Sequence, residues 1–124
     1  MVDNIDFFNV QFYNNPSCNL NSGEGFMASL SAWSDDIDSA FANGRFNRIN
    51  NGIEKPRLMI GVPAWEGAGS GYADTTSFKT IMQQVKSMCS TNCAGVMYWD
   101  GAYEVQSGGN GGQTFAEIVR EVFR

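Results

Sequence analysis

Three short apolar runs, typical of β-strands, alternate along this chain with three amphipathic runs typical of α-helices. The strand-like runs are residues 5–13, 58–62 and 95–99, and the helix-like runs are residues 26–41, 75–88 and 115–123. The connections are long enough for parallel strands, and the apolar character of the strands fits a sheet covered on both faces. Crossovers of one handedness place helices on one side, so three helices would cover only one face. The pattern therefore predicts an α/β unit that is a piece of a larger layered structure.

The helix-like runs also predict which residues face the core. Apolar side chains recur at spacings of three or four in the first helix, and they predict one buried face made of Phe26, Leu30, Trp33, Ile37 and Phe41. The carboxylates of residues 35–38 (DDID) fall on or near its solvated side. Asp74 or Thr75 can cap the second helix.

The composition excludes several classes of function. With 124 residues, 43% apolar and 17% charged, the chain is expected to form a single globular unit. A net charge of −5 argues against nucleic-acid binding, and no apolar run approaches the roughly 20 residues that span a membrane. There is no histidine, which excludes histidine-based acid–base catalysis and histidine metal ligands. The glycines of residues 67–71 miss the G-x-G-x-x-G spacing, so no nucleotide cofactor is expected.

The three cysteines and the first residues indicate what can be expected of disulfides, metal binding and a signal peptide. Cys89 and Cys93 are four residues apart and could form a bridge, unless local strain forbids it. Cys18 would then have its partner outside the chain or be a buried thiol. Four ligands at zinc-binding spacing are not present, so no metal is expected. The first residues lack the basic start and apolar stretch of a signal peptide, so none is expected.

Polar and aromatic side chains gather where the first and third strands end. Alternation places Gln11 and Tyr13 on one strand face, and Met97 and Trp99 share a face of the third strand. Ligands of α/β sheets bind at the carboxyl ends of the strands. A flat indole with phenol and amide groups at its edge suits a sugar ring, which offers an apolar face and a hydroxyl rim. The alternative is that Tyr13 and Trp99 are core aromatics.

Three segments carry a resemblance to a known family. They are residues 10–18 (VQFYNNPSC), residues 60–64 (IGVPA) leading into residues 68–72 (AGSGY), and residues 95–100 (GVMYWD). In this order and spacing they resemble glycoside hydrolase family 18 chitinases, most closely the class III type of plants and fungi. The resemblance covers nearly the whole chain. It implies that residues 1–124 correspond to strands six to eight of a (β/α)8 TIM barrel, a partial catalytic domain from the C-terminal portion.

The resemblance also implies roles for individual residues. Tyr13 matches the catalytic tyrosine, whose hydroxyl steadies the N-acetyl group of the substrate while the carbonyl oxygen of that group acts as nucleophile. Trp99 matches the tryptophan that forms the floor under the sugar. Gln11, Asn14 and Met97 match residues lining the same cleft. Trp65 departs from the family, which has a small residue at this position, and is expected at the mouth of the cleft. Cys18 matches a cysteine that relatives often bridge to an upstream cysteine.

The family's acid is a glutamate in an Asp-x-x-Asp-x-Asp-x-Glu motif, and neither look-alike in this chain completes it. Asp3 and Asp6 begin the pattern, but Phe8 and Val10 stand where the last aspartate and the glutamate should be. Residues 35–38 lie on a helix and have no glutamate at the required offset. Solvated charges are the preferred interpretation of both.

These observations predict the C-terminal part of an extracellular chitinase, a retaining enzyme that hydrolyses β-1,4 bonds of N-acetylglucosamine polymers with substrate assistance. The chain alone is expected to be inactive because it lacks the acid. The alternatives are a non-catalytic module that binds chitin or chito-oligosaccharides, and an inert fragment. Self-association or complementation through the open barrel edges is a further expectation.

Overall fold

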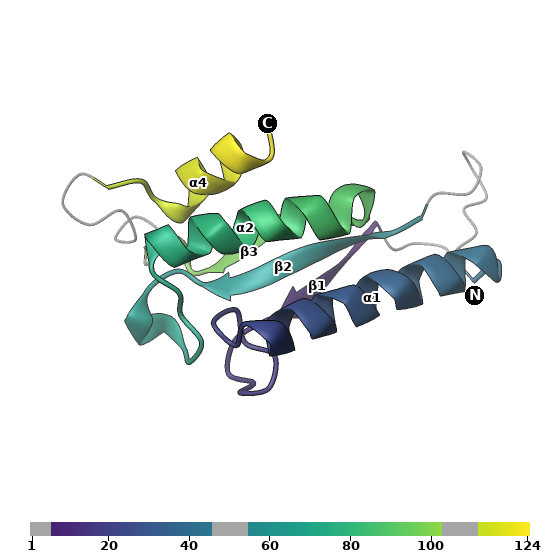
Figure 1. Ribbon diagram of the computed structural model, residues 1–124, viewed down its shortest axis with the longest axis horizontal. Helices are drawn as coiled ribbons and strands as arrows, with labels where there is room; N and C mark the ends of the chain where they lie inside the picture. The colour runs from purple at the N-terminus through teal and green to yellow at the C-terminus, as the bar shows by residue number, and fades with distance from the viewer. Residues whose placement is uncertain (1–5, 46–54, 103–111) are drawn as a thin grey trace.

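The computed structural model describes residues 6–45, 55–102 and 112–124. Strands and helices alternate as predicted (Figure 1). The elements are β1 Phe7–Gln11, α1 Glu24–Ala42, β2 Arg57–Pro63, the 3-10 turn η1 Glu66–Ala68, α2 Thr75–Cys89, the 3-10 turn η2 Ser90–Asn92, β3 Cys93–Trp99 and α4 Phe115–Val122. The three strands and three long helices that the periodicity predicts are therefore confirmed in kind and order.

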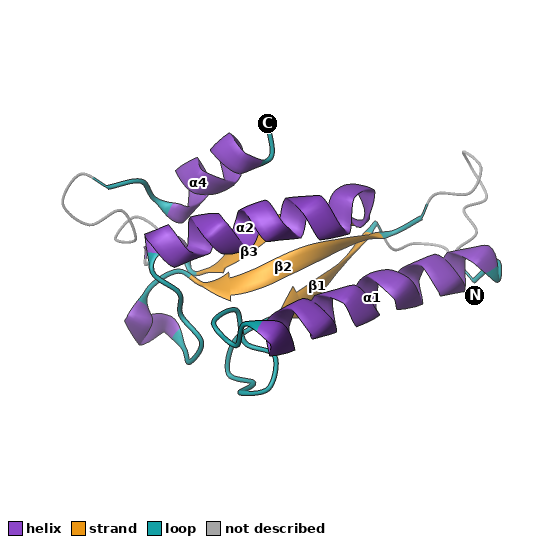
Figure 2. Ribbon diagram, viewed as in Figure 1, coloured by secondary structure: helices purple, strands orange, loops and turns teal. Residues whose placement is uncertain are grey.

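The sheet is parallel, and its strands lie side by side in sequence order, β1-β2-β3 (Figure 2). Gln11 of β1 is in register with Gly61 of β2, and Gly61 is in register with Met97 of β3. At the end of the strands, Pro63 pairs with Trp99. The register therefore brings the carboxyl ends of all three strands together at one end of the sheet.

The helices cover one face of the sheet. Figure 1 shows α1 and α2 on the same side, with α4 beside α2. Buried side chains from both layers form one apolar cluster: Phe12, Leu20, Phe26, Leu30, Ile37, Leu58, Ile60, Val62, Ala73, Phe78, Met82, Val85, Cys89, Phe115, Ile118 and Val122. The prediction that three helices cover one face is confirmed.

The opposite face differs from what the apolar strand sequences predict, because in the described part of the chain it is not fully covered. Phe7 is 49% exposed and Trp99 is 51% exposed, and the side chains of Asn9 and Gln11 are exposed as well. Alternation puts all four on the face turned away from the helices. The sheet therefore presents an apolar and amide-bearing surface beside the carboxyl ends of its strands.

Local capping explains where the later helices begin. The Asp74 carboxylate accepts a hydrogen bond of 2.8 Å from the Ser77 backbone N–H, so Asp74, and not Thr75, is the cap of α2. That hydrogen bond holds the pKa of Asp74 below its ordinary value. The α4 helix begins with a capping box, in which Thr114 and Glu117 each accept the other's backbone N–H.

The predicted buried face of α1 needs correction at Trp33 and at Phe41, which is only half-buried. Phe26, Leu30 and Ile37 are buried, but Trp33 is 37% exposed. Its ring lies 6.3 Å from that of Phe8, on the edge strand β1. Because β1 is the edge of the described sheet, Trp33 packs against a single strand and leaves part of its indole in solvent.

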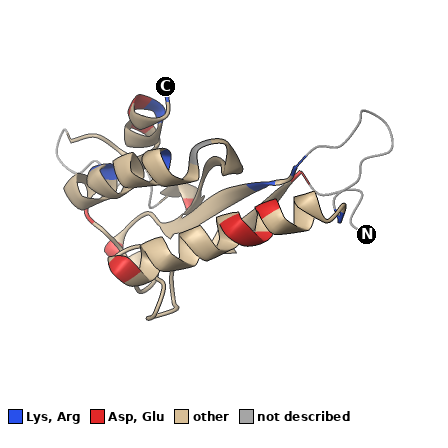
Figure 3. Cartoon of the chain, turned by 45° about the vertical axis from the view of Figure 1, so that its right-hand side comes forward, with Lys and Arg blue, Asp and Glu red and all other residues tan. Residues whose placement is uncertain are grey.

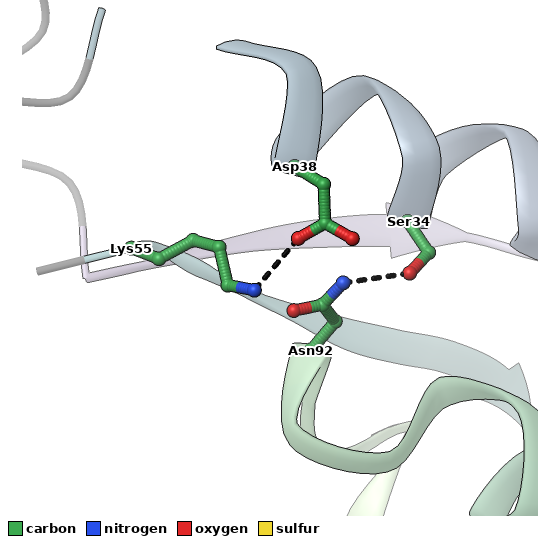
Figure 4. A network of polar contacts seen from close by, with 4 residues as sticks. All are labelled: Ser34, Asp38, Lys55 and Asn92. Atoms are coloured by element: carbon green, nitrogen blue, oxygen red, sulfur yellow. Dashed lines mark hydrogen bonds and ion pairs between the residues drawn. The ribbon is translucent and has the colours of Figure 1, made fainter. Parts of the chain in front are cut away.

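The structure settles the pairing of two cysteines. Cys89 and Cys93 form a disulfide with their Cα atoms 5.5 Å apart, and Cys18 is a free, half-buried thiol. The bridge joins the end of α2 to the start of β3 and encloses η2. Within this loop, Asn92 is buried and donates its amide N–H to the Ser34 hydroxyl of α1 at 2.7 Å (Figure 4). The disulfide loop is thereby held against α1.

An ion pair lies beside this contact. The Lys55 ammonium approaches the Asp38 carboxylate to 2.6 Å, and Figure 4 shows both next to Ser34 and Asn92. Two hydrogen bonds hold the pKa of Asp38 below its ordinary value, and the one from Lys55 has a larger effect than the one from Asn92. The pair links α1 to the chain just before β2.

We expect Asp38→Asn to lower stability slightly at neutral pH and to flatten its loss in acid. A depressed native pKa contributes stability above the unfolded-state pKa of about 3.9, and this stability is lost as the pH falls through the native value. Because the Asp38 side chain is 52% exposed, the effect should stay within about 1 kcal/mol. Urea unfolding at several pH values measures it. Asp36→Asn is the matched control on the same helix, and identical pH profiles of the two variants would contradict the assignment.

Candidate functional site

The candidate site lies at the carboxyl ends of the three parallel strands. Gln11 ends β1, and Met97 lies near the end of β3, in register with it through Gly61. A methyl group added at Gly61 would lie 2.8 Å from the Val10 carbonyl oxygen and 3.0 Å from the Met97 methyl carbon. Glycine at this position therefore leaves room for the Met97 side chain to reach from β3 over β2, toward Gln11.

Trp99 is the most exposed large aromatic side chain at this edge. It is 51% exposed at the end of β3, and its carbonyl accepts a hydrogen bond of 3.1 Å from the Ala64 backbone N–H after β2. The peptide bond that follows it, to Asp100, is cis. The interpretation of Trp99 as a core aromatic is therefore wrong, and its indole is available as a flat apolar surface.

Tyr13 lies two residues beyond β1 and is almost fully buried, at 7% exposure. Its carbonyl accepts a hydrogen bond of 3.3 Å from the Gln11 side-chain amide. Burial raises the pKa of the Tyr13 phenol above its ordinary value of about 10, so the hydroxyl stays protonated at neutral pH. The group can act as a hydrogen-bond donor at the strand ends. Its burial is equally what a packed aromatic residue would show.

Asn14 follows Tyr13 and joins the two loops at this end of the sheet. Its side-chain oxygen accepts the Ser70 backbone N–H at 2.8 Å, and its own backbone N–H donates to the Ser70 carbonyl at 3.0 Å. The loop after β1 is thus bound to the loop after β2. Ser70 has no role in the sequence interpretation, although it lies inside the recognised segment 68–72.

Trp65 lies just beyond β2, at the start of η1, and is half-buried. Its ring centroid is 6.2 Å from that of Tyr72, which in turn lies parallel to Phe115 at 6.0 Å. The preceding residue, Ala64, is the one bound to the Trp99 carbonyl. Trp65 is therefore two residues beyond the end of β2, with its ring against Tyr72.

The acidic look-alikes lie at the other end of the sheet. Asp6 precedes β1, and its carbonyl accepts the Arg57 backbone N–H, while Asp3 lies outside the described residues. Phe8, in the place of an aspartate, packs against the apolar cluster. Asp38 pairs with Lys55, ahead of β2. Figure 3 shows acidic segments in red along α1. The described members of both patterns thus lie near the amino ends of the strands, away from Tyr13 and Trp99.

The described residues offer neither a metal site nor a membrane-spanning helix. Among residues 6–45, 55–102 and 112–124, no three Cys, Asp or Glu side chains are grouped to hold a metal ion. No helix within these same ranges has the length and apolar character needed to cross a bilayer. The chemistry available at the strand ends is that of phenol, indole, amide and hydroxyl groups, together with the carboxylates of Glu66 and Asp100, which follow β2 and β3.

Comparison with known proteins identifies relatives of one kind. The chain is 32% identical over 105 residues to Endochitinase 3 of Metarhizium robertsii, and the aligned region covers 84% of this chain and 28% of that protein. It is 30% identical over 96 residues to Endochitinase 33 of Trichoderma harzianum, covering 77% of this chain and 27% of that protein. It is 31% identical over 108 residues to a basic endochitinase of Nicotiana tabacum, and the aligned region covers 84% of this chain and 30% of that protein. The chain is similar to chitinases.

The similarity has defined limits. The chain spans less than a third of the length of these curated relatives. No family model matches the sequence. A chitinase relationship over most of this chain is therefore established, while the relatives contain further sequence that has no counterpart here.

Proposed function

We propose that the chain is part of the catalytic barrel of a glycoside hydrolase family 18 chitinase and contributes its sixth to eighth βα units. One observation carries the proposal. The segments at residues 10–18, 60–64 and 95–100 are far apart in sequence, but each spans the carboxyl end of one of three neighbouring parallel strands. The uncovered sheet face beside them would then be the barrel interior. Similarity to fungal and plant endochitinases over 77–84% of the chain supports the same assignment.

The proposed reaction is retaining hydrolysis of β-1,4 bonds between N-acetylglucosamine units, with the N-acetyl carbonyl oxygen of the substrate as nucleophile. The Tyr13 hydroxyl is protonated at neutral pH, and burial raises its pKa further, so it would donate a hydrogen bond to that N-acetyl group. The exposed indole of Trp99 would stack against the sugar ring at the cleavage point. This chemistry uses no metal and no cofactor.

Four further positions complete the proposed cleft. Gln11 and Met97 lie on either side of Gly61 and would line its floor. Asn14, fixed by Ser70, would form its wall beside Tyr13. Trp65 is proposed for the mouth, because its backbone follows the residue that is bound to Trp99.

The uncovered face also bears on partners. Chitin or chito-oligosaccharides are the proposed substrates, and the extracellular space is the proposed location. The strands β1 and β3 form the edges of the described sheet, and such edges offer unpaired backbone groups to another strand. Pairing with a second copy, or with the strands that complete the barrel, is therefore part of the proposal.

We expect Trp99→Ala to weaken binding of an N-acetylglucosamine tetramer by roughly 30-fold, the loss typical of an aromatic hot spot. Isothermal titration calorimetry on the 124-residue chain measures it. Trp33→Ala is the matched control, since Trp33 is also a partly exposed tryptophan but lies on α1. Equal affinities of wild type and Trp99→Ala would contradict the proposed stacking.

The same titration separates the remaining candidates. Binding that depends on Trp99, with no turnover, favours a chitin-binding module, for which the half-exposed indole is the supporting observation. A wild-type chain that binds no oligosaccharide would favour an inert fragment.

A further inference from the structure

A reciprocal set of hydrogen bonds joins Asn14 and Ser70, which are 56 residues apart in sequence. The Asn14 backbone N–H donates to the Ser70 carbonyl at 3.0 Å. In return, the Asn14 side-chain oxygen accepts the Ser70 backbone N–H at 2.8 Å and the Ser70 hydroxyl at 3.3 Å. These contacts bind the loop after β1 to the loop after β2 directly beside Tyr13.

Asn19 closes the loop that begins at Asn14. It is buried, at 5% exposure, and its side-chain oxygen accepts the Asn15 backbone N–H at 2.7 Å. Its amide group also lies 3.5 Å from the Ser70 hydroxyl. The next residue, Leu20, donates its backbone N–H to the Phe12 carbonyl, which returns the chain to the residue that precedes Tyr13. The loop is thus fixed at both of its ends.

The backbone at Asn14 and the space at Gly69 fit this arrangement. Asn14 has a φ of 57°, in the left-handed region that asparagine tolerates better than most residues. A methyl group added at Gly69 would lie 3.0 Å from the Asn14 side-chain oxygen and 3.3 Å from Cδ2 of the Tyr13 ring. A side chain at position 69 would therefore crowd the Tyr13 ring, and Ser70 binds the residue that follows Tyr13.

We propose that Asn14, Asn19 and Ser70 form a polar clamp that positions Tyr13, so that Asn14 is a positioning residue and not a direct ligand of the sugar. Its side-chain oxygen accepts two hydrogen bonds from Ser70, of 2.8 and 3.3 Å, so this acceptor serves the clamp and is not open to a sugar hydroxyl. Asn14→Asp, which removes the amide N–H donors, tests the other half of the side chain. The clamp fixes the backbone on the carboxyl side of Tyr13, and the lack of a side chain at Gly69 leaves room for the Tyr13 ring. The inference rests on the proposed function, because the position of Tyr13 matters to a sugar only if one binds there.

The test compares the reactivity of Tyr13 with the affinity for sugar in the same variants of the full chain. Acetylation of Tyr13 by N-acetylimidazole, followed by peptide mass spectrometry, measures its accessibility in the absence of sugar. Asn14→Gly keeps the left-handed backbone and removes the acceptor oxygen, whereas Asn14→Asp keeps both. Gly69→Ala crowds the ring without removing a polar group. Gly101→Ala is its matched control, because an added methyl group there meets no atom within 4 Å.

We expect Asn14→Gly and Gly69→Ala to raise the acetylation rate of Tyr13 roughly fivefold, the factor that corresponds to one typical hydrogen bond. Their dissociation constants for the N-acetylglucosamine tetramer should rise by a similar factor. Asn14→Asp and Gly101→Ala should match the wild type in both measurements. Rescue by aspartate ties the effect to the acceptor oxygen, because a general loss of packing at this position would not be restored.

The two measurements separate the possible failures. Unchanged Tyr13 reactivity in both Asn14→Gly and Gly69→Ala would overturn the clamp. Weaker sugar binding by Asn14→Gly at unchanged Tyr13 reactivity would also overturn it, because Asn14 would then contact the sugar itself. A wild-type chain that binds no sugar, together with faster acetylation in the two variants, would uphold the clamp and reject the proposed function.

Discussion

Chito-oligosaccharides incubated with the 124-residue chain are expected to stay essentially intact. General-acid catalysis accelerates such reactions roughly 10²- to 10⁴-fold. The turnover rate of this chain should therefore be lower than that of a full-length chitinase by at least this factor. The described parts of its two acidic look-alikes lie near the amino ends of the strands, where Asp38 is paired with Lys55. Tyr13 and Trp99 lie at the opposite ends, so the described carboxylates of these look-alikes are not placed to protonate a leaving oxygen there.

Release of new reducing ends from an N-acetylglucosamine tetramer measures this expectation. Tyr13→Phe is the matched variant, since it removes only the hydroxyl that the proposed mechanism uses. Turnover by the pure wild-type chain that disappears in Tyr13→Phe would overturn the prediction, because the chain would then carry its own acid. Turnover that is equal in both proteins would point to a contaminating enzyme, and repurification would remove it.

Phe78→Ala is expected to cost about 3–5 kcal/mol in the free energy of unfolding. The side chain is fully buried on α2, and its ring lies 3.8 Å from that of Phe115 in a nearly parallel stack. Truncation leaves a cavity between α2 and α4 and removes the main aromatic contact that holds the last helix. Since whole domains have stabilities of about 5–15 kcal/mol, this loss would take a large share of the total.

Urea unfolding followed by circular dichroism measures the loss. Phe7→Ala is the matched control, because Phe7 is 49% exposed on the uncovered sheet face. Its truncation should change stability by less than about 1 kcal/mol. Similar losses in the two variants would show that the uncovered face is packed in solution, contrary to the structure.

The order of the elements was predictable from the sequence because it depends on local periodicity. Apolar spacing in α1 identified Phe26, Leu30 and Ile37 correctly as buried. It could not predict that Trp33 is 37% exposed, since that depends on α1 lying beside an edge strand. Periodicity reports which face of a helix is apolar, and only the tertiary structure decides how much of that face is covered.

The candidate site was predictable to the extent that it follows from strand ends. Tyr13 and Trp99 could be placed at one edge of the sheet because the carboxyl ends of parallel strands meet there. Ser70 was missed, because its contacts with Asn14 span 56 residues and leave no local pattern. The bridge between Cys89 and Cys93 stayed open for a related reason, since spacing alone does not fix the geometry that a disulfide needs.

The two ends of the sheet carry different kinds of side chain, and this has a consequence for protein engineering. The amino ends hold the contacts between Asp38 and Lys55 and between Ser34 and Asn92, which tie elements together. The carboxyl ends hold Tyr13 and Trp99, and the contacts between Asn14 and Ser70 there fix the loops around Tyr13. Substitutions that adjust tolerance to heat or acid can therefore be confined to the amino ends. Libraries that change ligand preference can be confined to the carboxyl ends, so the two properties can be optimised in separate rounds and then combined with little interference.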